Sequence, residues 1–193
     1  MGEEVGFIAA SLLVVLFLAL VLRIGALTKL NRQLREVARR DHLTGLFNRR
    51  EFDERLSAQI QHQTPFSVLM MDIDHFKRVN DSHGHAVGDA VLEGLARRVL
   101  GHVRIGDIPF RYGGEEFVLL AQVQVRDLAG VAQRLLQAVN GSYRAGTKRI
   151  PVTVSIGCAS WVPGESAAAL MRRADKALYL AKKNGRCRIE VAS

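Results

Sequence analysis

The sequence predicts an α/β sandwich in which helices cover a sheet of about five strands. Two observations indicate this class. Stretches with the four-residue spacing of amphipathic helices alternate with short strand-like runs between residues 48 and 191. The chain has 193 residues, of which 48% are hydrophobic and 24% charged, and this suits one globular domain with an appendage.

The first part of the expected domain contains a helix, a strand and two further helices. Residues 48–62 predict a helix, because Phe52, Leu56 and Ile60 recur at four-residue spacing. Pro65 then closes the link to the next element. There follow a buried strand that ends in carboxylates, a short helix with a loop, and a long helix: residues 65–74, 75–84 and 86–103.

The second part begins with a hairpin. Two strand-like runs, residues 108–112 and 116–122, are separated by Gly113 and Gly114, and glycine reaches the positive φ of tight turns without strain. The remaining expected elements are a helix, one or two strands, a helix and a last short strand: residues 125–140, 148–162, 166–184 and 186–191.

An uncharged apolar segment, Val5 to Leu22, precedes the domain. Eighteen helical residues extend about 27 Å, enough to span a bilayer core. Lys and Arg follow this segment and none precede it, which places the bulk of the protein in the cytoplasm. A cleaved signal peptide is the alternative, but its start should be basic, whereas this one has Glu3 and Glu4. We therefore expect a single-pass transmembrane anchor at residues 1–24.

Residues 25–40 predict an amphipathic linker helix. Leu27, Leu30, Leu34 and Val37 alternate at steps of three and four, the a/d spacing of a coiled coil. This narrow seam favours a parallel dimer. The alternative is a helix that packs on its own domain, which begins at residue 41.

The net charge of +8 divides into +3 on residues 1–40 and +5 on residues 41–193. The surplus is spread without a dense basic run or an aromatic stacking set, which argues against nucleic acid as the partner. A modest positive surplus of this kind also suits a domain that binds polyphosphate ligands. Cys158 and Cys187 are too few for a disulfide scaffold, and we expect both to be reduced thiols.

Four acidic residues fall at two predicted strand ends. Asp72 and Asp74 end the first strand, and Glu115 and Glu116 lie on the Gly-Gly hairpin. Carboxylates so placed can hold Mg²⁺ and leave metal positions free for phosphate oxygens. The glycines let a triphosphate approach backbone N–H donors. An isolated GGEE string is more often a solvated turn, but two neighbouring acidic strand ends favour phosphoryl transfer.

The sequence RYGGEEF, residues 111–117, resembles the signature of GGDEF-domain diguanylate cyclases, with Glu in place of Asp. Five more blocks agree in order and spacing from residue 41 to the C-terminus: DHLTGLFNRREF, MDIDHFKRVND, GHAVGD, VTVSIGC and RADKALYLAKKNGR. The resemblance implies a nucleotidyl cyclase-like sandwich with a central, mainly antiparallel sheet. It also implies an enzyme of bacterial second-messenger signalling, which joins two GTP into cyclic di-GMP and releases two pyrophosphates. The expected anchor would place this enzyme at the bacterial inner membrane, with its catalytic domain in the cytoplasm.

The resemblance assigns roles to residues at matching positions. Asp72, Glu115 and the carbonyl of Ile73 match metal ligands for a pair of Mg²⁺ ions, or Mn²⁺ in their place, and Glu115 and Glu116 match the catalytic acids. Asn80 and Asp89 match the residues that read guanine, whose N–H groups need such acceptors. The remaining matches surround the phosphates: the amides of His75 and Phe76, and the side chains of Lys77, Lys182 and Arg186.

The resemblance also implies regulation and assembly. Arg104 and Asp107 match an RxxD motif that binds cyclic di-GMP as an inhibitor, and Arg134 aligns loosely with a second arginine of that site. RxxD alone is commonly a surface ion pair. Since one domain holds one GTP, catalysis implies a homodimer. Cys187 departs from the family pattern, because many relatives have Asn there.

Two other functions remain open. A catalytically silent domain of this fold would act as a receptor for cyclic di-GMP or a partner protein, but silent forms should have lost hairpin acids or guanine contacts. An enzyme that makes a related cyclic dinucleotide is the third candidate, and Asp89 favours guanine over it. The sequence contains no recognisable input domain.

Overall fold

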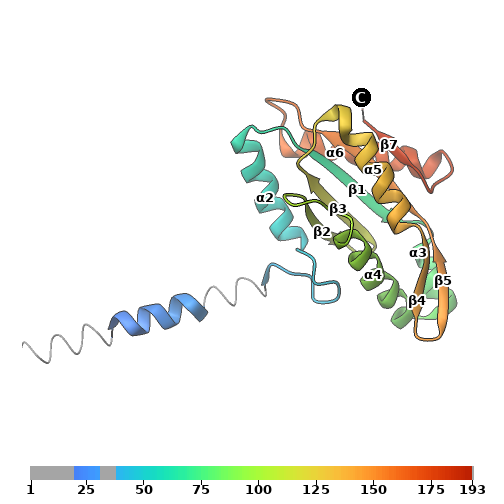
Figure 1. The fold of residues 1–193 in the computed structure, drawn as a ribbon, viewed down its shortest axis with the longest axis horizontal. Helices are drawn as coiled ribbons and strands as arrows, with labels where there is room; N and C mark the ends of the chain where they lie inside the picture. Colours follow the sequence, from blue (N-terminus) through green and yellow to red (C-terminus); the bar gives the residue numbers. More distant parts are fainter. Residues whose placement is uncertain (1–19, 31–37, 193) are drawn as a thin grey trace, which may run out of the picture. The chain divides into compact units, whose positions relative to one another are not determined.

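The computed structural model describes residues 20–30 and 38–192, and the chain divides between Arg39 and Arg40 into two units. In the larger unit, helices lie on both faces of a sheet (Figure 1). In the smaller unit, residues 20–30 form a helix with exposed apolar side chains, among them Leu22 and Leu27.

The predicted location of the protein at the membrane is wrong. Within residues 20–30 and 38–192, no helix is long and apolar enough to cross a membrane. This contradicts the single-pass placement in the bacterial inner membrane. The first nineteen residues of the predicted anchor, and the heptad positions Leu34 and Val37, lie outside the described residues.

The central sheet has five strands in the order β2-β3-β1-β6-β7. Their bounds are β1 (Ser67–Ile73), β2 (Ile108–Gly113), β3 (Glu116–Ala121), β6 (Val154–Ser160) and β7 (Ile189–Val191). β1 lies in the middle and pairs antiparallel with β3 and β6, whereas β7 pairs parallel with β6. The predicted α/β fold with a mainly antiparallel sheet of about five strands is confirmed.

A separate two-stranded hairpin consists of β4 (Gly141–Ala145) and β5 (Lys148–Val152). The sequence does not predict β4, and the run at residues 148–162 divides into β5 and β6. Tyr143 and Ala145 are the buried residues of β4, and polar residues and glycines flank them. With two apolar positions, the strand is too short for periodicity to reveal it.

The helices of the larger unit cover both faces of the sheet. They are α2 (Arg49–His62), α3 (Phe76–His83), α4 (His85–Leu100), α5 (Val125–Val139) and α6 (Ala167–Lys183). Alternate residues of β1 point to opposite faces, as strand geometry requires. Leu69 and Met71 belong to a buried cluster with residues of α4 and α5, and Val68 and Met70 to one with residues of α2 and α6.

A glycine permits the close packing of α6 on β6. A Cβ at Gly157 would lie 2.1 Å from the backbone nitrogen of Leu178 and 2.4 Å from the carbonyl oxygen of Ala174. Any larger residue would therefore push α6 away from the sheet. This packing lets α6 present Lys182 to the end of β1, where the candidate site begins.

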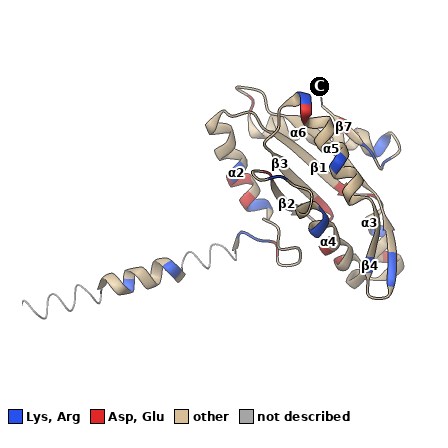
Figure 2. Ribbon diagram, viewed as in Figure 1, with Lys and Arg blue, Asp and Glu red and all other residues tan. Residues whose placement is uncertain are grey.

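Basic and acidic residues are interspersed over the larger unit (Figure 2). Some pair on one helix, such as Arg50 with Glu54 on α2 and Arg97 with Glu93 on α4. These pairs are largely exposed, so each contributes little to stability. The charges that matter for chemistry lie instead at the ends of β1 and β3.

Candidate active site

Three carboxyl groups lie near one another where β1 ends and β3 begins. The antiparallel register places Asp72 opposite Glu116, and Glu115 precedes Glu116 in the turn from β2. The Asp72 side chain is nearly buried, whereas both glutamates are half-buried. The structure thus brings together the hairpin acids and the first acid of the DID sequence.

Burial and the neighbouring carboxylates raise the pKa of Asp72 and of Glu116. Burial is the largest effect on Asp72 and raises its pKa, and the charge of Glu115 adds to the rise. Burial likewise raises the pKa of Glu116, followed by the charge of Asp72. Like charges held close in a partly buried site are costly unless a cation compensates them.

Lys182 supplies part of that compensation. Its Nζ lies 2.7 Å from Asp72 Oδ2, and its charge lowers the pKa of both Asp72 and Glu116. One lysine carries a single positive charge against three carboxyl groups, so the site retains an excess of negative charge. That excess fits a divalent cation.

The donor chemistry also fits Mg²⁺, which prefers carboxylate and carbonyl oxygens. In residues 20–30 and 38–192, however, no group of three or more His, Cys, Asp or Glu side chains is gathered as a metal-holding cluster. The fit therefore rests on the excess charge and on the oxygen ligands that Asp72, Glu115 and the Ile73 carbonyl offer.

Asp74 does not belong to the carboxylate cluster, although the sequence groups it there. Its side chain is buried, and both of its oxygens accept hydrogen bonds. Thr153 Oγ1 and the backbone N–H of Cys187 donate to Oδ2, and Ser155 Oγ donates to Oδ1. These contacts direct the carboxylate toward β6 and the C-terminal turn.

A cavity of about 530 Å³ lies beside the hairpin, between α3, α4 and Glu115. It gathers five of the predicted site residues: Phe76, Lys77, Asn80, Asp89 and Glu115. Gly88 makes room for the Asn80 side chain, because a Cβ there would lie 1.9 Å from Asn80 Oδ1. An amide and a carboxylate thus line one cavity next to the acidic hairpin.

A second cavity, of about 370 Å³, lies on the other side of the acid pair. Glu116, Lys182 and Asp175 line it together with Lys176, Leu178 and Tyr179. Consecutive glutamates of the hairpin therefore face different cavities. Arg186 lines neither of the two; it is exposed in the turn after α6, with a φ of 61°.

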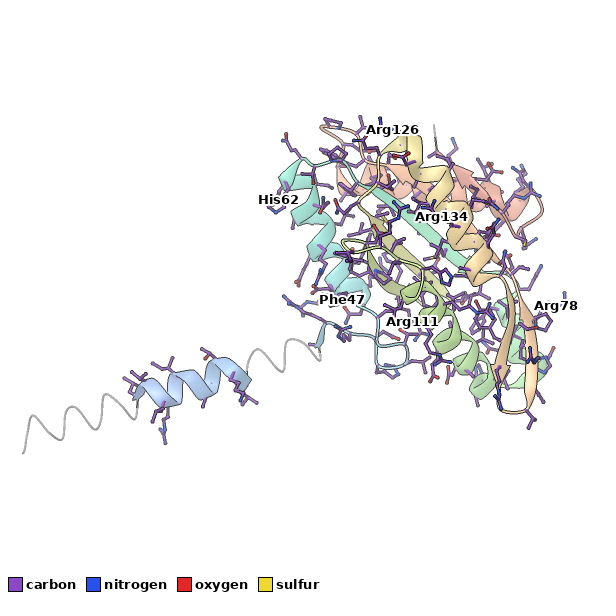
Figure 3. All side chains as sticks on the ribbon, in the orientation of Figure 1. Phe47, His62, Arg78, Arg111, Arg126 and Arg134 are labelled. Carbon is purple, nitrogen blue, oxygen red and sulfur yellow. The ribbon has the colours of Figure 1, made fainter. Side chains whose placement is uncertain are left out.

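Arg111 holds the hairpin turn, a role that the sequence reading does not assign. Its guanidinium donates to the carbonyl oxygen of Gly114 and forms an ion pair of 3.0 Å with Asp41. Burial acts to raise the pKa of Asp41, but hydrogen bonds from Thr44 and Arg111 hold it below its ordinary value. Figure 3 labels Arg111 between the N-terminal loop and the sheet. The position of Arg111 in RYGGEEF is the feature of the sequence that could have indicated this role.

The residues predicted for a product site lie apart from both cavities. Asp107 accepts hydrogen bonds from the backbone N–H groups of Arg104 and Gln122, which fixes the turn before β2. Arg104 and its neighbour Ile105 are exposed. Arg134 is exposed on α5, and Figure 3 labels it there. The side chain of Asp107 therefore serves the turn, and that of Arg104 faces solvent.

The fold and these carboxylates define an α/β domain with an acidic site suited to a divalent cation. Residues 38–188 match the family described as "Diguanylate cyclase, GGDEF domain". The chain belongs to this family, and its hairpin carries the sequence GGEEF.

Similar proteins agree with this assignment. The response regulator PleD of Caulobacter vibrioides is 41% identical over 160 residues, which cover 78% of this chain and 35% of PleD. A crystal structure of the diguanylate cyclase SiaD from Pseudomonas aeruginosa, in complex with its activator SiaC, has a TM-score of 0.79 and 38% identity. That match covers 91% of this chain and 72% of SiaD.

A second crystal structure contains the coiled coil and GGDEF domain of DgcB from Caulobacter crescentus in complex with c-di-GMP. It has a TM-score of 0.78 and 31% identity, and the match covers 88% of this chain and 94% of that chain. The chain spans about a third of the length of PleD.

Proposed function

We propose that this protein is a diguanylate cyclase, which condenses two GTP molecules into cyclic di-GMP and releases two pyrophosphates. The observation that carries the proposal is the pairing of Asp72 with Glu116 across β1 and β3, beside a cavity lined by Asn80 and Asp89. Membership of the GGDEF family supports the same reaction.

The base-reading residues determine the substrate. In the cavity of about 530 Å³, the carboxylate of Asp89 and the amide of Asn80 accept from the N1–H and N2–H₂ groups of guanine. Adenine has an acceptor at N1 and lacks the 2-amino group, so it leaves these acceptors unpaired. A site built to bond such groups rejects the analogue that lacks them.

The phosphates lie toward the carboxylate cluster in this proposal. The amides of His75 and Phe76 face them at the start of α3, and Lys77 contributes a positive charge. Lys182 and Arg186 approach from the other side of the site, on α6 and on the turn after it. Cations on two sides hold a flexible triphosphate in one geometry.

Asp72, Glu115 and the carbonyl of Ile73 are the residues that would hold Mg²⁺. When bound, Mg²⁺ neutralises charge that develops on the reacting phosphate. Membership of the GGDEF family supports Mg²⁺ as the metal, in keeping with the resemblance of these positions to metal ligands. Glu116 has a raised pKa, mainly because of its burial, and this favours it as the group that accepts the proton of an attacking 3′-hydroxyl.

Two copies of the chain must face each other, because each half-site holds one GTP and each 3′-hydroxyl attacks the α-phosphate of the other. We propose that residues 25–40 promote this pairing through their heptad leucines and raise the effective concentration of the second half-site. A chain beginning at Asp41 should lose specific activity at low protein concentration. Activity that stayed independent of concentration would exclude the dimer mechanism.

We also propose that the reaction product binds at Arg104, Asp107 and Arg134 and inhibits the enzyme. The exposed guanidinium of Arg104 is free to meet a phosphate, while Asp107 fixes the turn that presents it. This site lies away from both cavities of the catalytic centre.

Pyrophosphate release from GTP and from ATP tests the proposed reaction. With Mg²⁺ present, we expect release from GTP, little from ATP, and none from Glu115→Gln with either nucleotide. A folded dimer, freed of bound cyclic di-GMP, that releases no pyrophosphate from GTP would favour a receptor for cyclic di-GMP. Release from ATP as fast as from GTP would favour a different cyclic dinucleotide.

A further inference from the structure

The carboxylate of Asp74, which follows β1, accepts hydrogen bonds from two segments that are distant from it in sequence. They are the start of β6 and the turn before β7. Asp74 follows β1, and its two oxygens accept from Thr153 before β6, from Ser155 in β6 and from Cys187 before β7, at 2.7 to 3.1 Å. Its backbone N–H also donates to the carbonyl oxygen of Thr153 at 2.9 Å. A buried carboxylate with every oxygen engaged is a fixed point in the structure.

The backbone on both sides of this point is in a conformation that residues with a Cβ rarely adopt. His75, directly after Asp74, has a φ of 58°. Arg186 has a φ of 61° and Cys187 one of 50°. Left-handed residues other than glycine persist where the surroundings hold them. Asp74 accepts a hydrogen bond from Cys187 in one of these segments and directly precedes His75 in the other.

The two segments carry residues to which the proposed function assigns the triphosphate. His75 and Phe76 offer backbone amides at the start of α3, and Arg186 lies one residue before the N–H that Asp74 accepts. The metal-side carboxylate of Asp72 lies two residues before Asp74. Asp74 therefore lies between the two segments that carry the proposed phosphate-binding groups.

We propose that Asp74 is a positioning residue that holds these two backbone segments in register for the triphosphate. The inference rests on the proposed function, because it concerns the phosphate end of that same site. In this proposal Asp74 acts through the backbone segments it holds, because its oxygens already accept hydrogen bonds from Thr153, Ser155 and Cys187.

If Asp74 positions the phosphate-binding segments, its loss should affect phosphate binding and base binding differently. The base cavity is lined from α3 and α4, by Asn80 and Asp89 among others, and does not include Asp74. Loss of the Asp74 carboxylate should therefore weaken binding of the triphosphate and leave recognition of guanine nearly intact. A role in folding alone would weaken both together.

The test compares the affinities of the full-length chain for a non-hydrolysable GTP analogue and for guanosine, by calorimetry or ligand-observed NMR. For Asp74→Ala we expect the analogue to bind about 10–100-fold more weakly, the range seen when a residue that orients a binding group is removed. Guanosine affinity should change by less than about twofold, in keeping with a base cavity that Asp74 does not line.

Two further variants sharpen this result. Asp74→Asn keeps one oxygen for Thr153 and Cys187 and can donate to Ser155 Oγ, so it should restore most of the lost affinity. Ser67→Ala is the matched control, because Ser67 is a buried polar residue at the opposite end of β1, bonded to Val123 and Ser160. It should leave the affinity ratio of the two ligands unchanged.

Equal weakening of both ligands by Asp74→Ala, or none of either, would overturn the inference. If that variant does not fold, Ser155→Ala removes one of the three donors and should still reduce the preference for the GTP analogue. The binding assay requires no turnover. A wild-type chain that prefers the analogue yet makes no cyclic di-GMP would refute the proposed function alone, whereas a chain with no preference would refute both.

Discussion

Lys182 Nζ lies 2.7 Å from Asp72 Oδ2, and this ion pair connects α6 to the end of the central strand. The lysine side chain is about one-third exposed and the aspartate is nearly buried. Removal of the lysine would leave a buried carboxylate beside two others, which is costly. The pair thus shows how the helix and the sheet together shape a site with excess negative charge.

Burial and the excess negative charge predict that ionised Glu116 lowers the stability of the folded protein, although the proposed reaction needs it. Because its folded-state pKa is raised, the folded protein binds more protons than the unfolded chain between the ordinary and the raised value. Stability is therefore lost as pH rises through this window and is not lost below it. Glu116→Gln should raise Tm at pH 7.5 by about 2–4 °C, should have less effect near pH 4, and should abolish turnover.

Thermal unfolding of wild type and Glu116→Gln at several pH values provides the measurement. Exposed Glu54, on α2 and away from the site, gives the control Glu54→Gln. A Tm difference that did not grow between pH 4 and pH 7.5 would mean that burial and the neighbouring carboxylates do not destabilise ionised Glu116.

Gly157→Ala should be strongly destabilising. The new Cβ would lie 2.1 Å from a backbone nitrogen of α6, so the helix must shift. Overpacking of this kind typically costs about 1–3 kcal/mol, and the shift should also separate Lys182 from Asp72. Denaturant unfolding and GTP turnover measure the two effects. Gly130→Ala, whose new Cβ meets nothing within 4 Å on α5, should leave turnover unaffected and raise stability by about 0.5–1 kcal/mol, because Ala favours a helix more than Gly does.

Asp89→Asn should reduce selectivity for guanine. The amide nitrogen would face N–H groups of the base, leaving donors unpaired at a cost of about 1–3 kcal/mol. We expect kcat/KM for GTP to fall by about 10–100-fold, with a smaller change for ATP. Steady-state rates with both nucleotides measure this. A parallel fall for both would indicate that Asp89 does not read the base.

Arg104→Ala should relieve product inhibition. Its guanidinium is exposed next to a turn that Asp107 holds, and we expect the inhibition constant of cyclic di-GMP to rise about tenfold or more on loss of one charged contact. Initial rates at graded concentrations of added cyclic di-GMP measure the constant. If the wild-type rate does not respond to the product, the proposed inhibitory site is wrong.

Features that follow local pattern could be predicted from the sequence. The apolar run ending at Asp72, the Gly-Gly turn before Glu115 and the periodic helix that carries Lys182 all correspond to elements of the structure. The long helix predicted for residues 86–103 ends earlier, at Leu100. Helix ends depend on caps and on packing more than on periodicity.

Features that depend on contacts between distant segments could not be predicted. The ion pair of Arg111 with Asp41 spans 70 positions, and the bond from Cys187 to Asp74 spans 113. No periodicity signals such pairs. For the same reason the sequence grouped Asp74 with the carboxylate cluster, whereas the fold directs it toward Ser155 and Thr153.

The identity of the nucleotide product tests the central claim most directly. Purified protein would be incubated with GTP and Mg²⁺, and the nucleotides separated by chromatography with mass detection, in parallel with Glu115→Gln. We predict cyclic di-GMP from the wild type, at half the molar amount of GTP consumed, and none from the variant. Unchanged GTP from a folded, product-free wild-type dimer would contradict the account.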